Sequence, residues 1–112
     1  MSAYIHEVAV NNILSLAFSF IEKEENRCIG VYAMDERGNY VRPQSREAVK
    51  FCSIGALHKA FFLLGSSNLD RNYAFRKINN ASHYLYGDNM LTVNDNFGHK
   101  AVCDVYREAI KG

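Results

Sequence analysis

Polar residues that could carry catalytic or binding chemistry gather in the stretch TVNDNFGHKAVCDVYREAI, residues 92–110. Asn94, Asp95 and His99 lie within six positions, just before a run with helical apolar spacing. Asn or Asp side chains placed there can accept hydrogen bonds from the free N–H groups of a first helical turn, which stabilises a helix by about 1 kcal/mol. We therefore expect Asn94 and Asp95 to cap the last helix. The alternative is a polar rim of Asn94, Asp95 and His99, where a substrate group or a partner docks.

A cysteine nucleophile is the second chemistry to consider, because Cys52 and His58 lie close together in FCSIGALHKA. A helix turns by about 100° per residue, so His58, six positions later, points well away from Cys52. If that helix begins near Ser45, Cys52 lies about two turns inside it and is a small buried apolar residue. His99 could still approach Cys52 in space. This leaves open a small hydrolase or transferase that uses Cys52 with His99 and Asp95.

Metal and cofactor motifs do not occur in the sequence. The cysteines form no CxxC pair, the histidines form no HxxxH or HExxH pair, and the glycines form no GxGxxG or Walker loop. We therefore expect no metal and no cofactor.

The charge of the chain bears on nucleic-acid binding. The formal net charge of +1 argues against a general nucleic-acid binder, which usually carries a strong basic excess. A second alternative function is a weak nucleic-acid-binding module, whose affinity would collapse with salt. Its contacts would be the basic side chains Arg37, Arg42, Arg46 and Lys50.

Hydrophobic spacing predicts the first half of the fold. A helix is expected over about residues 3–25, with one apolar stripe formed by Val10, Leu14, Ala17, Phe18 and Ile21. Alternation over residues 28–34 predicts a strand. DERGN at residues 35–39 then predicts a turn with Gly38 in the left-handed region, and residues 40–41 begin the return strand of a hairpin.

The second half is predicted to be helical. A central helix is expected from an N-cap at Ser45 to a stop at Gly65, and the small Gly55 inside it lets another backbone approach closely. The next helix is expected to start at Asp70 and end at Gly87. The last helix buries Val102, Val105, Tyr106 and Ala109.

Together these elements predict one domain over residues 1–112 of the helix-dominated α+β class, with about four helices packed against one β-hairpin. The three cysteines are odd in number and far apart, which favours reduced thiols in the cytoplasm over a disulfide framework. We expect no signal peptide and no contact with a membrane.

The motif C-x-x-G-A-L at Cys52–Leu57 and the pair Asn94–Asp95 also carry a resemblance. With the YAMDERG strand end, they resemble a family of small uncharacterised bacterial and phage proteins, a domain of unknown function. The resemblance implies the same fold and places the Cys52–Ala56 segment against Asn94 and Asp95. Members often have Trp where Cys28 stands and Thr or Arg at positions 99 and 100, which counts against His99 as an essential base.

The sequence thus favours a small cytoplasmic, non-enzymatic interaction or regulatory protein, encoded by a phage or a mobile element, that acts by binding another protein. Self-association into a homodimer is one form of this. Tyrosine joins an apolar body to a polar tip, and an open strand edge can pair with a partner. The expected contact residues are Tyr32, Tyr40, Asn94 and Asp95.

Overall fold

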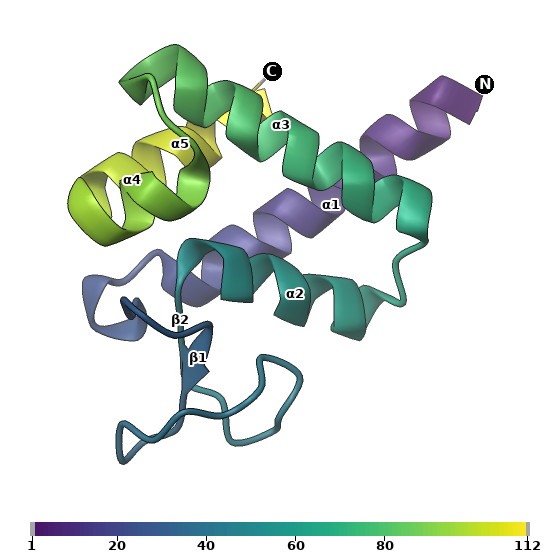
Figure 1. Ribbon diagram of the computed structural model, residues 1–112. Helices are drawn as coiled ribbons and strands as arrows, with labels where there is room; N and C mark the ends of the chain where they lie inside the picture. Colours follow the sequence, from purple (N-terminus) through teal and green to yellow (C-terminus); the bar gives the residue numbers. More distant parts are fainter. Residues whose placement is uncertain (1, 112) are drawn as a thin grey trace.

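The computed structural model describes residues 2–111, with side chains from residue 6 onward (Figure 1). The helices within this range are α1 (Ser2–Ile21), α2 (Ser53–Leu64), α3 (Asn68–Tyr86), α4 (Met90–Asn96) and α5 (His99–Lys111). The remaining elements are the 3-10 turn η1 (Glu24–Asn26) and the strands β1 (Ala33–Met34) and β2 (Lys50–Phe51), which pair in antiparallel fashion. The helix-dominated α+β class is confirmed, with five helices in the described range where about four were expected.

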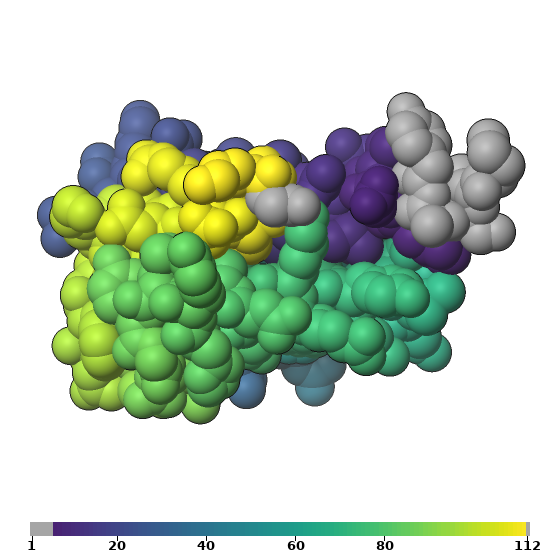
Figure 2. Space-filling view, turned by 90° about the horizontal axis from the view of Figure 1, so that it is seen from above, coloured from purple at the N-terminus to yellow at the C-terminus, as the bar shows by residue number. Residues whose placement is uncertain are grey.

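α1 is the helix around which the others pack. It contacts α2, α3 and α5, and Figure 2 shows α3 and α5 side by side on one face of the molecule. The predicted apolar stripe is confirmed, because Val10, Leu14, Ala17 and Ile21 are all buried and Phe18 is half-buried against the same core. α1 ends at Ile21 rather than near residue 25, and the charged residues after it enter solvent and η1. No helix within residues 2–111 is long and apolar enough to cross a membrane.

The turn after β1 forms as predicted. The carboxylate of Asp35 accepts hydrogen bonds from the backbone N–H groups of Arg37 and Asn39, each at 2.9 Å. Gly38 has φ +82°, a left-handed conformation that glycine adopts without steric cost. Tyr40 then makes an isolated antiparallel bridge to Met34, so the expected return strand exists only as a single bridge.

The ladder partner of β1 is β2, in a segment that the sequence assigned to the central helix. Ala33 pairs with Phe51 and Met34 with Lys50. The predicted start of that helix is therefore wrong: α2 begins at Ser53, with Cys52 as its N-cap. The Ser45 hydroxyl instead accepts a local hydrogen bond from the N–H of Glu47 at 3.1 Å.

Helix ends separate the remaining elements. The stops at Gly65 and Gly87 are confirmed, since both glycines cap their helices in the left-handed conformation. The predicted start at Asp70 is wrong, because Ser67 is the N-cap of α3 and its side chain accepts from the N–H of Asp70. Asp70 lies in the first turn instead, where its carboxylate contacts Nδ1 of His6 in α1 at 2.7 Å.

Gly55 allows α2 to lie directly against the backbone of Tyr32, just before β1. A Cβ atom placed on Gly55 would lie 1.9 Å from the backbone oxygen of Tyr32 and 2.7 Å from its carbonyl carbon. Only glycine fits at this contact, because real Cβ atoms do not approach backbone so closely. The predicted close approach at Gly55 is confirmed, and the approaching segment is the one that leads into β1.

Candidate functional site

Tyr32, Tyr40 and Cys52 flank the two short strands and line one pocket. The register places Tyr32 opposite Cys52, whose backbone N–H donates to the oxygen of Tyr32 at 3.1 Å. On the other side of β1, Tyr40 bridges to Met34. Tyr32 directly precedes β1, and its ring packs edge-on against His58 of α2 with the ring centroids 5.8 Å apart.

α4 forms the opposite wall. Leu91 and Asp95 are four residues apart in this helix, so they lie one above the other on the same face. Both are exposed. The two walls border a half-open pocket of about 350 Å³, lined by Gly30, Val31, Tyr32, Tyr40, Cys52, Leu91 and Asp95. Three of the four predicted contact residues, Tyr32, Tyr40 and Asp95, thus line one pocket.

Asn94, the fourth predicted contact residue, lies behind the pocket and is completely buried. Its Oδ1 accepts from the N–H of Ser53 at 3.0 Å, and its Nδ2 donates to the oxygen of Cys28 and to Oδ1 of Asp95, both at 3.2 Å. Its backbone oxygen accepts from Nη1 of Arg27 at 2.7 Å. Asn94 therefore holds the start of α2, the segment after η1 and the Asp95 side chain in one place.

The expectation that Asn94 and Asp95 cap the last helix is wrong. Asn94 and Asp95 lie inside α4, whose N-cap is Asn89, and α5 begins only at His99. Asn94 does satisfy a free N–H at a helix start, but that helix is α2, and its N–H belongs to a residue 41 positions earlier in the chain. The contact that the resemblance implies between Cys52–Ala56 and Asn94 is present in this hydrogen bond.

The thiol of Cys52 accepts a hydrogen bond from the backbone at the start of α2. Its Sγ accepts from the N–H of Gly55 at 3.2 Å, and the residue is buried. Burial raises the pKa of Cys52 above its ordinary value, and burial also raises the pKa of Cys28 from 9.0 to about 11. Both groups are thus held as neutral thiols, whereas a cysteine nucleophile acts as its thiolate.

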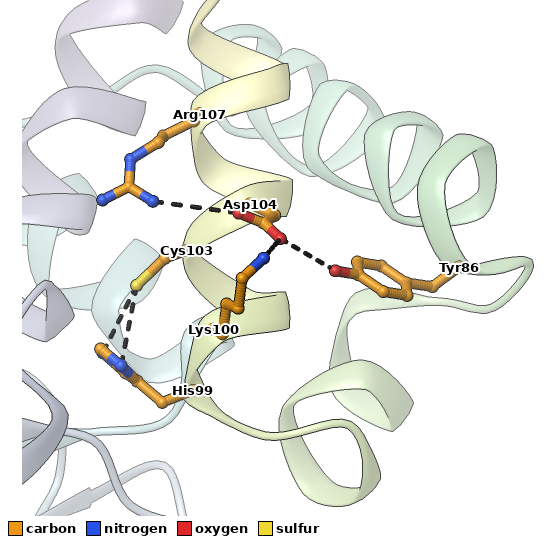
Figure 3. A network of polar contacts seen from close by, with 6 residues as sticks. All are labelled: Tyr86, His99, Lys100, Cys103, Asp104 and Arg107. Atoms are coloured by element: carbon orange, nitrogen blue, oxygen red, sulfur yellow. Dashed lines mark hydrogen bonds and ion pairs between the residues drawn. The ribbon is translucent and has the colours of Figure 1, made fainter.

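His99 belongs to a different part of the structure. Its Nε2 lies 2.8 Å from the oxygen of Ile21 and 3.4 Å from Sγ of Cys103, one turn further along α5 (Figure 3). His99 does not line the pocket that Cys52 shares with Asp95. The three side chains of the enzyme alternative are therefore not gathered in one cleft.

A surface network on α5 lies beside this contact. Oδ2 of Asp104 accepts from the hydroxyl of Tyr86 at 3.0 Å and from Nζ of Lys100 at 2.9 Å, and Arg107 lies 3.9 Å from Oδ1 (Figure 3). The hydrogen bond from Lys100 lowers the pKa of Asp104. These contacts fasten the end of α3 to α5.

Two of the four basic residues of the nucleic-acid alternative lie among acidic ones. Arg37 and Arg46 line a separate surface hollow together with Asp35, Glu36 and Glu47. Mixed charge of this kind does not form the continuous basic surface that phosphates require. Within the described side chains, no group of three His, Cys, Asp or Glu residues is arranged to hold a metal ion.

Sequence reasoning missed three residues of the pocket, Gly30, Val31 and Leu91. The signal for Leu91 was Asn89, whose side chain accepts from the N–H of Thr92 and starts α4. An N-cap at Asn89 would have put Leu91 and Asp95 on one helical face.

No family model, no curated protein and no solved structure matches the chain.

Proposed function

We propose that this chain is a small non-enzymatic interaction module that acts by binding another protein through the pocket between the sheet and α4. The observation that carries the proposal is that Tyr32, Tyr40 and Asp95 line this single pocket together with Leu91. Tyrosine anchors of this kind are enriched at the centres of protein interfaces.

The exposure of the pocket walls supports the same function. The exposed fractions are 43% for Tyr32, 58% for Tyr40 and 42% for Leu91, and Ile29 beside the pocket is 50% exposed. An exposed apolar surface with polar groups at its rim is typical of a surface that a partner covers. A second copy of the chain is one partner that could cover this surface.

The rigid support of the pocket also favours binding. Asn94 and Gly55 hold α4, α2 and the strand segment in contact, so the walls are formed before any partner arrives. Preformed walls lower the entropic cost of binding, because fewer groups must become ordered. The neutral, buried Cys52 supports a structural role for the thiol in this pocket over a nucleophilic one.

We also propose a cytoplasmic location. The support is that Cys28, Cys52 and Cys103 are all free and buried. Free thiols in this number are typical of a reducing compartment.

Affinity purification from the cell of origin tests the function. The chain is tagged and compared with the double variant Tyr40→Ala, Leu91→Ser and with the control Tyr84→Ala, a tyrosine that is 79% exposed outside the pocket. We expect the double variant to lose at least one co-purifying protein, counted by quantitative mass spectrometry, that the control retains. Identical partner sets for all three chains, with unchanged thermal stability, would contradict the proposal.

A further inference from the structure

Within the described residues, the carboxylate of Asp95 in this pocket forms no ion pair, although the charges of Arg27 and Lys50 both act on the neighbouring Cys28. Among the described residues, the ion pairs involve Asp70, Asp104 and Glu108, and none involves Asp95. Arg27 lies at the same end of α4, but its guanidinium donates to the backbone oxygen of Asn94. Among the described side chains, Nδ2 of Asn94 donates to the Asp95 carboxylate at 3.2 Å.

The position of Asp95 in its helix makes this carboxylate unusual. Asp95 lies in the last turn of α4, where the helix dipole is negative and favours cations over anions. Helix stability therefore does not account for an aspartate here. A positively charged ligand would be attracted by the carboxylate, whereas the helix end already has Arg27 on the oxygen of Asn94.

The tyrosines restrict the kind of cation. Tyr32 and Tyr40 line the pocket beside Asp95, and a cation near a tyrosine ring is attracted by the electrons of its face. A planar guanidinium can also stack on an aromatic ring and bind a carboxylate through two parallel N–H groups, which a lysine ammonium cannot do. The chemistry of the walls therefore fits arginine better than lysine.

The size of the pocket restricts the ligand further. The volume of about 350 Å³ lies at the lower end of the roughly 300–1,000 Å³ found for ligand pockets, so there is room for one side chain but not for a dinucleotide. An anionic ligand would be repelled by Asp95. A purely apolar ligand would take the carboxylate out of water without a partner, which is costly.

We propose that this pocket binds an arginine side chain presented by the partner protein. Tyr32 and Tyr40 supply the aromatic surface, Asp95 accepts hydrogen bonds from the guanidinium, and Leu91 covers the aliphatic stem. This inference rests on the proposed function and names the chemical group that the module recognises.

The test is a titration of the ¹⁵N-labelled chain with N-acetyl-argininamide, followed by NMR of the backbone amides. N-acetyl-citrullinamide is the matched ligand control, because citrulline has nearly the shape of arginine without its charge. A fragment of this size binds with a dissociation constant on the order of 1 mM. We expect saturable shifts at Gly30, Val31 and Leu91 with the arginine compound and at least about fivefold weaker binding of the citrulline and lysine analogues.

Two variants assign the effect to the pocket. Asp95→Asn keeps the acceptor for Asn94 and removes the charge, and Tyr40→Ala removes an exposed ring. Each should weaken binding at least about fivefold. Glu7→Gln, an exposed position near the start of α1, removes the same charge elsewhere and should change nothing. Equal binding of citrulline, equal binding of lysine, unchanged binding by Asp95→Asn, or the absence of saturable shifts at the three amides would each overturn the inference.

The two proposals fail separately. A partner that still depends on Tyr40 and Leu91 but binds Asp95→Asn as well as the original chain would refute arginine recognition and leave the module function standing. Saturable arginine binding in the pocket of a chain whose co-purifying proteins ignore the pocket would refute the module function and the protein source of the arginine, and would leave only recognition of the guanidinium standing.

Discussion

Oδ1 of Asn94 lies 3.0 Å from the backbone nitrogen of Ser53, and this hydrogen bond joins α4 to the first residue of α2. Both residues are completely buried. The free N–H groups at a helix start need acceptors, and here a side chain from another helix supplies one. The same amide donates to Cys28 and to Asp95, so the helix start and the acidic wall of the pocket are fixed by one side chain.

Asn94→Ala should lower the free energy of unfolding by about 2 kcal/mol or more. It leaves the N–H of Ser53 and the oxygen of Cys28 buried without their side-chain partner, and each such group costs about 1–3 kcal/mol. Urea unfolding followed by circular dichroism measures the change. The matched control, Asn72→Ala at an exposed position of α3, should stay within about 0.5 kcal/mol. A loss at Asn94 no larger than in the control would remove its proposed structural role.

Gly55→Ala should destabilise the protein although alanine is the better helix former. The new Cβ would lie 1.9 Å from the oxygen of Tyr32, so β1 and α2 must separate. Overpacking costs about 1–3 kcal/mol, which exceeds the gain of about 1 kcal/mol from helix propensity. Thermal unfolding measures the balance, with the exposed α1 substitution Ser15→Ala as the neutral control. A rise in stability at Gly55 would show that the two layers are not in contact there.

Tyr106→Phe should lower stability by about 1 kcal/mol. The buried hydroxyl of Tyr106 donates to the oxygen of Ser53 at 2.7 Å, and a net hydrogen bond of this kind contributes about 0.5–1.5 kcal/mol. Burial raises the pKa of Tyr106 well above its ordinary value, so the group stays a donor throughout the working pH range. Tyr84→Phe removes a hydroxyl from a residue that is 79% exposed and should change urea unfolding little.

Alkaline pH should destabilise the fold through Cys28. Its pKa is about 11 when folded and 9.0 without the environment of the fold, so the stabilisation is complete below pH 9 and is lost as pH rises through about 11. Chemical unfolding at pH 8, 9, 10 and 11 should show this fall. The Cys28→Ala variant should show a shallower fall, and an identical pH profile would count against a raised pKa.

Thiol labelling gives an independent reading of the same group. The Cys28 side chain is buried and its pKa is raised, and both effects should make iodoacetamide modify folded Cys28 much more slowly than the unfolded chain at pH 8. Mass spectrometry of digested protein follows the rate at each cysteine. A cysteine introduced by Ser15→Cys at an exposed position should label at the unfolded rate.

Local patterns were sufficient for much of the fold. The stripe from Val10 to Ile21 depends only on helical spacing, and the turn at Asp35 and Gly38 depends on residues within four positions of each other. Gly55 was recognised because glycine inside a helix is costly unless another backbone lies against it. In each case the deciding interaction is either short in sequence or demanded by one residue type.

Partners distant in sequence decided the points where the prediction failed. The spacing of Ala48, Cys52, Ala56 and Ala60 fits a helix, but Lys50 and Phe51 pair with β1 and delay its start to Ser53. The expected cap of the last helix by Asn94 is wrong, because its side chain accepts from the start of α2, 41 positions earlier, and no local pattern indicates that partner. Tyr32, Tyr40 and Asp95 were expected as contact residues, whereas their meeting in one pocket depends on the sheet register and on α4.

Photo-cross-linking in the cell of origin tests the central claim most directly. The light-activated residue p-benzoylphenylalanine replaces Tyr40 in one chain and Tyr84, an exposed tyrosine outside the pocket, in another. We predict that irradiation joins the Tyr40 chain to a specific protein, or to a second copy of itself, and that adding Leu91→Ser reduces this product. The Tyr84 chain should not form it. The same products from both chains, or no product at Tyr40, would contradict a binding function for the pocket.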